Sequence, residues 1–432
     1  MSRSVGQLLY AAALLAAVLL CTCASAQPAP SAATALDLLT VHQRALQAAP
    51  PLQLLQAQRA EREAALRAAG ARLGPQLEAV WQQGGGRDAL AARTAQGSLL
   101  LTQPLIDLPR WQARDAARHR LAAGEAEQAQ GEQQLRQLSA RLFVQLHAQS
   151  QAQRVQRELQ QAYAEEARRM GVRHREGLAA AVDWRQSQSF QLLADAGARN
   201  GAQQLRALRQ ALVAHAGDAS LLDAAIQGLR ADALPPALEA PAAGSGRSPR
   251  HDAQRAERDA REQELHAARQ ATLPTLSLQA QAQRDLQSRP RHGSDWLLQL
   301  RIPLWDSGSR AAGRDAAAQR LRAAEAELMQ LERDLAREQA TQAERLLSAR
   351  EQHATATGGL QAAEQTVAAM RIGQEQGTRS TTDVLLALQT LGQLRQLAVA
   401  AQLEAWLAWI DGLVAQGRFD EGALAALNTQ LE

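Results

Sequence analysis

The chain has 432 residues and a formal net charge of +3, and 46% of its residues are hydrophobic whereas only 3% are aromatic. Every basic residue is arginine, and these arginines are dispersed rather than gathered, so the composition does not favour a nucleic-acid-binding surface. The nine histidines show no H-E-x-x-H spacing, and no G-x-S-x-G motif or phosphate loop occurs. The sequence therefore predicts no enzyme activity, no cofactor and no metal site.

The N-terminus has the features of a secretory signal peptide over residues 1–26. Arg3 precedes an apolar run at 8–20, and small residues at 24–26 form a cleavage site. Lipidation of Cys21 or Cys23 is disfavoured because Leu20 and Thr22 stand where a small residue is needed; an uncleaved anchor is the other alternative. After residue 27 we expect no stretch near the ~20 residues of a spanning helix, so the chain is soluble or crosses a membrane as strands.

Residues 32–72 have leucines at helical spacing, and Pro50 and Pro51 divide them into two predicted helices. The pattern then changes to strict alternation, which predicts one strand hairpin at about 76–105 and another at about 275–304. One apolar and one Gln/Arg face suit a membrane barrel wall, but four strands cannot close a barrel whose smallest form has about eight. Either several chains share one barrel, or these are small soluble hairpins.

Each strand hairpin precedes a very long segment that is almost free of proline. Residues 106–176 and 306–376 would each form a helix of ~105 Å. Breaks at Gly177 and Gly377 precede return helices, so helical hairpins are predicted at about 106–215 and 305–416. Residues 216–250 are rich in Pro and Gly and read as a linker, and residues 417–432 form a C-terminal tail.

The chain reads as two copies of one unit. Residues 57–63 (AQRAERE) recur almost unchanged at 253–259 (AQRAERD). Further markers recur in the same order: Pro75 and Pro274, QPLID at 103–107 and IPLWD at 302–306, and a Gly followed six residues later by Asp at 177 and 377. The first structural repeat is therefore predicted at 27–215 and the second at 251–416.

This layout resembles the TolC-like outer-membrane efflux protein family. The segments that carry the resemblance are LGPQL at 73–77, LPTL at 273–276, IPLWDSG at 302–308 and GTRSTTDVL at 377–385. The resemblance implies a homotrimer of mixed α/β membrane fold. Four strands per chain would join a shared twelve-stranded outer-membrane β-barrel, and the long helical hairpins would form a periplasmic α-barrel. Residues 216–250 and the tail would lie in an equatorial region.

By the same resemblance, the hairpin turns lie at a constricted periplasmic tip. Asp183, Arg379 and Asp383 would be gating residues there, with Gly177, Gly377 and Thr378 forming the turns. Arg379 could bond a neighbouring hairpin, and three copies of Asp383 could form an anionic ring. The alternative is capping alone, in which Gly377, followed by Thr378 and Ser380, forms a helix C-cap and a new N-cap, and the two acids favour helix N-termini.

Two departures from the family weaken the expected latch. Leu386 stands where a second acid is common, and Gln374 stands where an aromatic residue often braces the tip. Tryptophans 81, 111, 296 and 305 lie near strand ends, as in an interfacial aromatic belt or in ordinary packing. Trp406 and Trp409, three residues apart on one helix, are expected to pack.

The resemblance implies an outer-membrane exit duct of a Gram-negative bacterium that performs no chemistry. Its partners would be a periplasmic membrane-fusion adaptor, an inner-membrane transporter driven by ATP or protons, and outer-membrane lipid. The ending at 416–428, QGRFDEGALAALN, looks like that of type I protein secretion members. The alternatives are a multidrug or metal efflux channel and, from another class, a periplasmic coiled-coil adaptor or scaffold.

Overall fold

The computed structural model describes residues 37–84, 94–220, 234–238, 248–285 and 292–431. The predicted signal peptide, with Cys21 and Cys23, lies outside the described residues. The first half contains α2 (Leu38–Ala48), α3 (Pro50–Ala71), β1 (Gln76–Gly84), β2 (Thr94–Ile106), α4 (Leu108–Arg175) and α5 (Ala181–Ala216). The second half contains α6 (Pro249–Gln270), β3 (Thr275–Asp285), β4 (His292–Arg301), α7 (Ser309–Glu375), α8 (Thr381–Ala415) and α9 (Glu421–Leu431).

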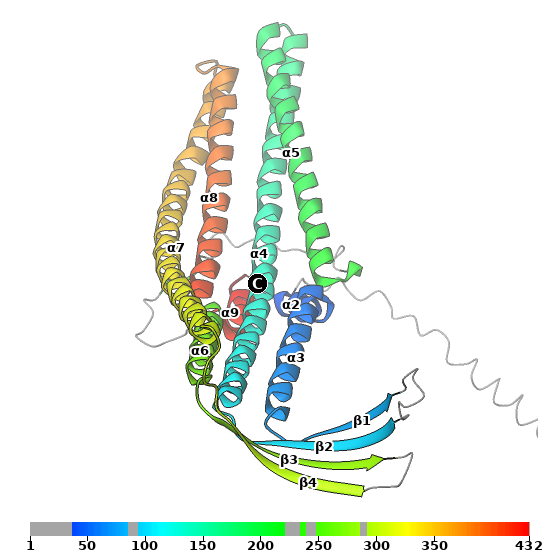
Figure 1. Cartoon of the computed structure of the whole chain (residues 1–432). Helices are drawn as coiled ribbons and strands as arrows, with labels where there is room; N and C mark the ends of the chain where they lie inside the picture. Colours follow the sequence, from blue (N-terminus) through cyan, green and yellow to red (C-terminus); the bar gives the residue numbers. More distant parts are fainter. Residues whose placement is uncertain (1–36, 85–93, 221–233, 239–247, 286–291, 432) are drawn as a thin grey trace, which may run out of the picture.

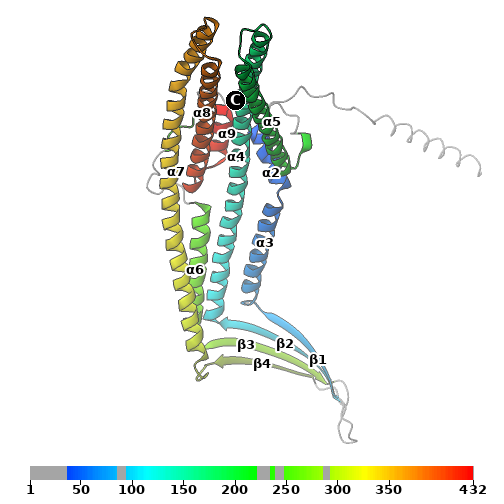
Figure 2. The same cartoon turned by 90° about the horizontal axis from the view of Figure 1, so that it is seen from above.

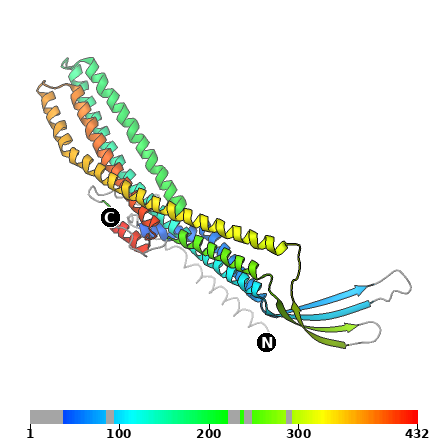
Figure 3. The ribbon, with the colours of Figure 1, turned by 60° about the vertical axis from the view of Figure 1, so that its left-hand side comes forward.

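The two halves follow the same order of elements and lie side by side. In each half a helix leads into a strand hairpin, and the strand hairpin leads into a long helical hairpin. The strands form a sheet at one end of the molecule, and the helical hairpins α4/α5 and α7/α8 extend to the other end (Figures 1 and 3). The view from above shows both hairpins running in the same direction away from the sheet (Figure 2). The predicted fold class is confirmed.

Local sequence explains where the helices begin and end. The Asp37 carboxylate accepts hydrogen bonds from the backbone N–H of Leu39 and Thr40, at 3.4 and 3.0 Å, and so begins α2. Pro50 begins α3 at a position where a missing N–H costs nothing. The Asp107 carboxylate caps α4 through the N–H of Arg110 at 3.1 Å. Gly217 ends α5 with φ +70°, which a residue with a side chain adopts only under strain.

The four strands form one antiparallel sheet in the order β1-β2-β3-β4. The register aligns Leu77 with Leu101 and Ala280 with Trp296, so most apolar positions of the four strands fall on one face, although Leu100 and Leu297 lie on the other. The opposite face carries Glu78 and several glutamines. Gln279 donates to Gln299 there at 2.9 Å. The expected alternation is therefore continuous across the hairpins of both halves.

The second strand hairpin is shorter than the sequence predicts. Strand β4 ends at Arg301, whereas the alternating pattern extends through Leu304. Pro303 explains the difference, because proline has no N–H for the ladder and restricts the residue before it. In β2 the corresponding Pro104 is tolerated, but the pairing shifts register between Pro104 and Ile106.

The main core lies midway along the molecule, where α2, α4, α8 and α9 meet. Its largest fully buried side chains include Trp406, Phe143 and Phe419. The rings of Trp406 and Trp409 meet edge to face at 5.7 Å, which is the packing expected of them. The tail is part of this core: Asn428 of α9 accepts from the N–H of Leu38 at 3.1 Å and donates to Asp37 at 2.9 Å.

Helix α8 corrects one expectation. By length and hydropathy it could cross a membrane, although no spanning helix is expected after residue 27. Half of its most apolar window is buried in the chain, where it packs between α7 and α4. Its hydropathy is therefore explained by burial on two sides, as in the core helix of a bundle.

Candidate functional site

The candidate site is the helical tip, where the α4/α5 and α7/α8 turns lie at the end farthest from the sheet (Figure 1). The two turns have the same backbone. Gly177 and Gly377 both have φ +76°. In the first turn the N–H of Leu178 bonds the carbonyl of Arg173 at 2.8 Å, and in the second that of Thr378 bonds Gly373 at 2.8 Å. Both turns are therefore Schellman ends that require a left-handed residue at the glycine.

The two return helices begin differently. Ser380 caps α8: its hydroxyl accepts from the N–H of Asp383 at 3.2 Å, and the Asp383 carboxylate accepts from the N–H of Ser380 at 2.9 Å. Ala180 begins α5 without a side-chain cap, and Asp183 lies in the first turn of that helix. The capping alternative thus describes what Asp383 does within one chain, whereas Asp183 makes no such bond.

Electrostatics keep Asp383 charged. The hydrogen bonds from the backbone and side chain of Ser380 hold the pKa of this carboxyl below its usual value, and the nearby cation of Arg379 acts in the same direction. Asp383 remains partly exposed. It can therefore cap the helix and still present negative charge to the surroundings of the tip, so the two readings of this residue are compatible.

Arg379 lies on the outside of the turn with its stem folded over Gly373. A Cβ on Gly373 would stand 2.6 Å from the Arg379 Cγ, so only glycine allows this approach. Within the described residues the Arg379 guanidinium has no hydrogen bond or ion pair, and Arg379 is exposed. A guanidinium carries five donors, so this group is available to a carboxylate or carbonyl outside the chain.

A buried polar contact joins the two hairpins behind the turns. Gln374, which is 3% exposed, donates to the Glu166 carboxylate at 2.7 Å, and Glu166 is 1% exposed. Thr381 lies beside them, with its hydroxyl 3.2 Å from the Met170 sulfur. Residue 374 therefore braces the tip through an amide rather than an aromatic ring.

Two further contacts connect the hairpins near the same level. The Thr382 hydroxyl donates to the Gln186 side chain at 3.0 Å, and the Tyr163 hydroxyl donates to the Leu385 carbonyl at 3.4 Å. Burial raises the pKa of Tyr163 to about 12. Sequence reasoning missed Glu166, Tyr163 and Gln186, because nothing in their local sequence indicates which helix they face.

The first turn has an aromatic brace of its own. The rings of His174 and Trp184 stack with centroids 5.3 Å apart, and His174 Nδ1 lies 3.1 Å from the Ala179 carbonyl. Gly171 lets Trp184 approach, since a Cβ there would be 3.2 Å from the indole Nε1. The equivalent positions of the second hairpin are Gln374 and Val384, which face the other hairpin instead.

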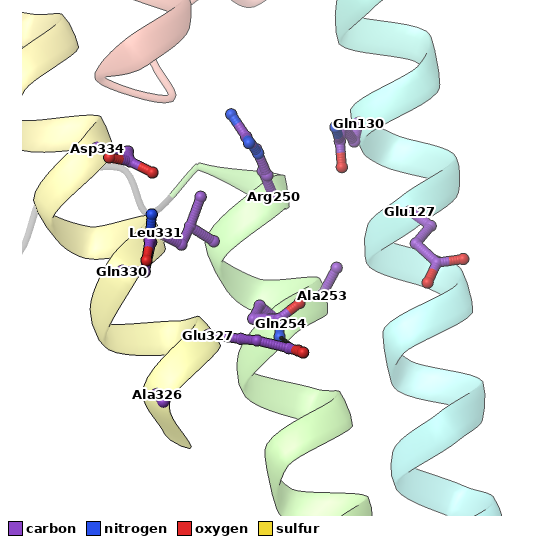
Figure 4. A pocket seen from close by; sticks show the side chains of 10 residues that line it. All are labelled: Glu127, Gln130, Arg250, Ala253, Gln254, Ala326, Glu327, Gln330, Leu331 and Asp334. Atoms are coloured by element: carbon purple, nitrogen blue, oxygen red, sulfur yellow. Dashed lines mark hydrogen bonds between the residues drawn. The ribbon is translucent and has the colours of Figure 1, made fainter. Parts of the chain in front are cut away.

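A hollow away from the tip is polar and internally paired. A groove of about 590 Å³ between α4, α6 and α7 is lined mainly by polar side chains (Figure 4). Of these, Glu127 is paired with Arg62 at 2.8 Å and Glu327 accepts from Gln254 at 2.9 Å. Within the ranges that the structure describes, no three His, Cys, Asp or Glu side chains are grouped to hold a metal ion.

Comparisons with known proteins concern the fold of the chain. The sequence model of the family "Outer membrane efflux protein" matches residues 245–411. No curated protein matches the chain. The fold is similar to the outer membrane protein VceC of Vibrio cholerae, with a TM-score of 0.77, 19% identity and 88% of this chain and 96% of that chain covered. It is similar to the CmeC outer membrane channel of Campylobacter jejuni, with a TM-score of 0.78, 14% identity and 95% of each chain covered.

A third similar structure is the open state of the MtrE outer membrane channel of Neisseria gonorrhoeae, with a TM-score of 0.74 and 16% identity. This likeness covers 88% of the present chain and 89% of that chain. At such identities the likeness concerns the fold, and it extends over both halves of the molecule.

Proposed function

We propose that the chain is a member of the outer membrane efflux protein family, whose sequence model matches residues 245–411, and that three copies assemble into an exit duct that carries substrates across the periplasm and the outer membrane. Members of this family are transport ducts rather than enzymes, and they lie in the outer membrane and extend into the periplasm. The sheet of each chain would contribute to the membrane barrel, and the helical hairpins to a periplasmic tube.

The observation that carries the proposal is the uncovered sheet. Its apolar face lies beyond the helices, and Trp296 and Trp81 on that face are 78% and 63% exposed. Strands β1 and β4 are the edges of the sheet and leave their outer ladders unpaired within the described residues. Pairing β4 of one copy with β1 of the next closes the edges, and lipid covers the apolar face.

The experiment that tests the proposed duct is single-channel recording of the purified protein in a planar lipid bilayer. Discrete, cation-preferring steps are expected, because the barrel encloses water and the proposed tip is acidic. Recovery of the protein from the soluble periplasm, with no insertion, would replace the duct by a periplasmic scaffold. An adaptor, the other rival from that class, is disfavoured by the two hairpins and the continuous apolar sheet face.

At the tip we propose that Asp383, together with Asp183 in the first turn of the other return helix, detains cations and that Arg379 holds neighbouring hairpins together. The free guanidinium of Arg379 and the ionised Asp383 support these roles. Asp383→Ala is expected to weaken divalent-cation block of the current, with Asp183→Ala as the matched comparison in the other hairpin. Arg379→Ser is expected to raise resting conductance. Unchanged block and unchanged resting conductance would limit these residues to capping and turn formation.

For cargo, we propose type I protein secretion with an inner-membrane transporter and a periplasmic adaptor. The support is the resemblance of the ending at 416–428. In the structure this ending packs Phe419, Leu424 and Leu427 into the core, so it also has a structural role. Deleting the gene and measuring both secreted proteins and drug or metal tolerance separates the alternatives. Loss of tolerance with an unchanged set of secreted proteins would favour the multidrug or metal efflux channel.

A further inference from the structure

Three polar side chains from three helices meet at the edge of the main core, where His42 and Ser139 are buried and His215 is half-buried. His42 of α2 and Ser139 of α4 are 3% and 0% exposed, and His215 lies in the last turn of α5. The Ser139 Oγ is 2.8 Å from His215 Nε2 and 3.4 Å from His42 Nδ1. This is where α5 ends, so the cluster joins the base of the first hairpin to α2 and α4.

The hydrogen bonds fix how protons are arranged in this cluster. The Ser139 hydroxyl donates to the Leu135 carbonyl at 2.9 Å, which leaves its oxygen to accept from the imidazoles. Each histidine can then donate one N–H to Ser139 while remaining neutral. His42 Nε2 is buried and has no hydrogen-bond partner among the residues that the structure describes. A second proton on His42 would therefore place a charged N–H where no described group accepts it.

The charged groups around His42 come from three elements and mostly oppose protonation. Burial lowers the pKa of His42, and Arg136 of α4 and His215 of α5 add to this effect, whereas Glu421 of α9 acts against it. Burial also lowers the pKa of His215. A helix C-terminus favours a cation, but here the loss of hydration outweighs that attraction.

We propose that His42, Ser139 and His215 form an acid-sensitive joint, which fixes the base of α5 to α2 and α4 at neutral pH and releases it when the imidazoles gain protons. The joint acts through the folded chain itself and does not depend on cargo or pump. Both imidazoles are harder to protonate in the folded chain than in the unfolded one. The stabilisation is therefore complete above the unfolded pKa of about 6.5 and is lost as pH falls below it.

Hydrogen exchange of the full-length protein in detergent at pH 7.5 and pH 5.5 tests the joint. After correction for intrinsic exchange, protection of α2 and of the last turns of α5 is expected to fall by about tenfold for each imidazole that gains a proton, since pH 5.5 lies one unit below the unfolded pKa. In the double variant His42→Asn, His215→Gln the amide groups keep a donor near Ser139 but cannot be protonated. Its protection in these segments is expected to be nearly independent of pH.

His353→Gln is the matched control, because His353 is also buried, at 7% exposed, but lies on α7 outside the cluster. This variant is expected to keep the full pH response. If the double variant assembles poorly, the single variant His215→Gln can be used instead. It removes the imidazole that makes the shorter bond to Ser139, and it is expected to reduce the change in protection between pH 7.5 and pH 5.5. An equal response in wild type and the His215→Gln variant, or loss of the response in the His353→Gln variant, would overturn the joint.

Discussion

The two helical hairpins share a turn but differ in what surrounds their return helices. Helix α8 buries nineteen of its residues, whereas α5 buries five. The difference arises because α8 packs against both α7 and α4, while α5 packs mainly against α4. Val182, Leu192 and Leu193 of α5 consequently remain exposed in the single chain. The second hairpin is thus stabilised within the chain, and the first depends more on its base and on the proposed neighbours.

The largest effect is expected from Trp406→Ala at the base of α8. Trp406 is 0% exposed, and its removal leaves a cavity in the main core. Loss of such a side chain costs about 3–5 kcal/mol of the free energy of unfolding. Because a membrane oligomer of the kind proposed would unfold irreversibly, the measurement is the apparent Tm of the purified protein at one fixed scan rate.

Position 206, which is 200 residues earlier on α5, supplies the control. Arg206 is exposed and, among the described residues, bonds only its own helix, through the Ala202 carbonyl at 3.3 Å. Arg206→Ala is expected to change stability by no more than about 0.5 kcal/mol, as for ordinary surface positions. Equal losses of apparent Tm in Arg206→Ala and Trp406→Ala would mean that α8 is not more deeply packed within the chain than α5.

The next effect concerns the contact between the hairpins. Gln374→Ala removes the donor at 2.7 Å from the buried Glu166 carboxylate, leaving the Arg169 guanidinium at 3.8 Å as its remaining ion-pair partner. A buried acceptor that loses its donor costs about 1–3 kcal/mol. Hydrogen exchange at the tip should therefore accelerate in both hairpins.

Glu165→Gln is the matched control for that prediction. Glu165 is exposed and pairs with the same arginine, Arg169, at 2.8 Å. Exposed ion pairs of this kind contribute at most about 1 kcal/mol, so this variant should leave exchange at the tip nearly unchanged. Acceleration confined to the second hairpin in the Gln374→Ala variant would show that the bond to Glu166 does not join the hairpins.

Local patterns predicted the fold because the strands and turns are encoded locally. Alternation around Trp81 and Trp296 and the spacing of Gly177 and Gly377 each concern a few neighbouring residues. The contacts of the site are different, since Gln374 and Glu166 lie 208 residues apart. Which face of a 68-residue helix meets which partner depends on the packing of whole helices, and no short pattern specifies it.

A smaller effect is expected from replacing each turn glycine with alanine. Gly177 and Gly377 have the same φ, and a Cβ on either would meet nothing within 4 Å. The cost should therefore come from the backbone alone, at about 1–2 kcal/mol. Apparent Tm values of Gly177→Ala and Gly377→Ala should agree. A much larger loss for one of them would show that its turn carries an additional contact.

The smallest effect is expected from exchanging the helix-capping residues of the two hairpins. This exchange is also the sharpest test of the comparison between the two return helices. Ala180 and Ser380 have similar backbone angles, at φ −70°, ψ 148° and φ −82°, ψ 160°, and an aspartate follows each three residues later. Ser380→Ala should weaken the start of α8 by about 1 kcal/mol. Ala180→Ser should create the same capping box with Asp183 and slow exchange in the first turn of α5. If Ala180→Ser leaves that turn unchanged, the two turns differ in more than their cap residue, and the absence of a cap on α5 reflects its environment rather than its sequence.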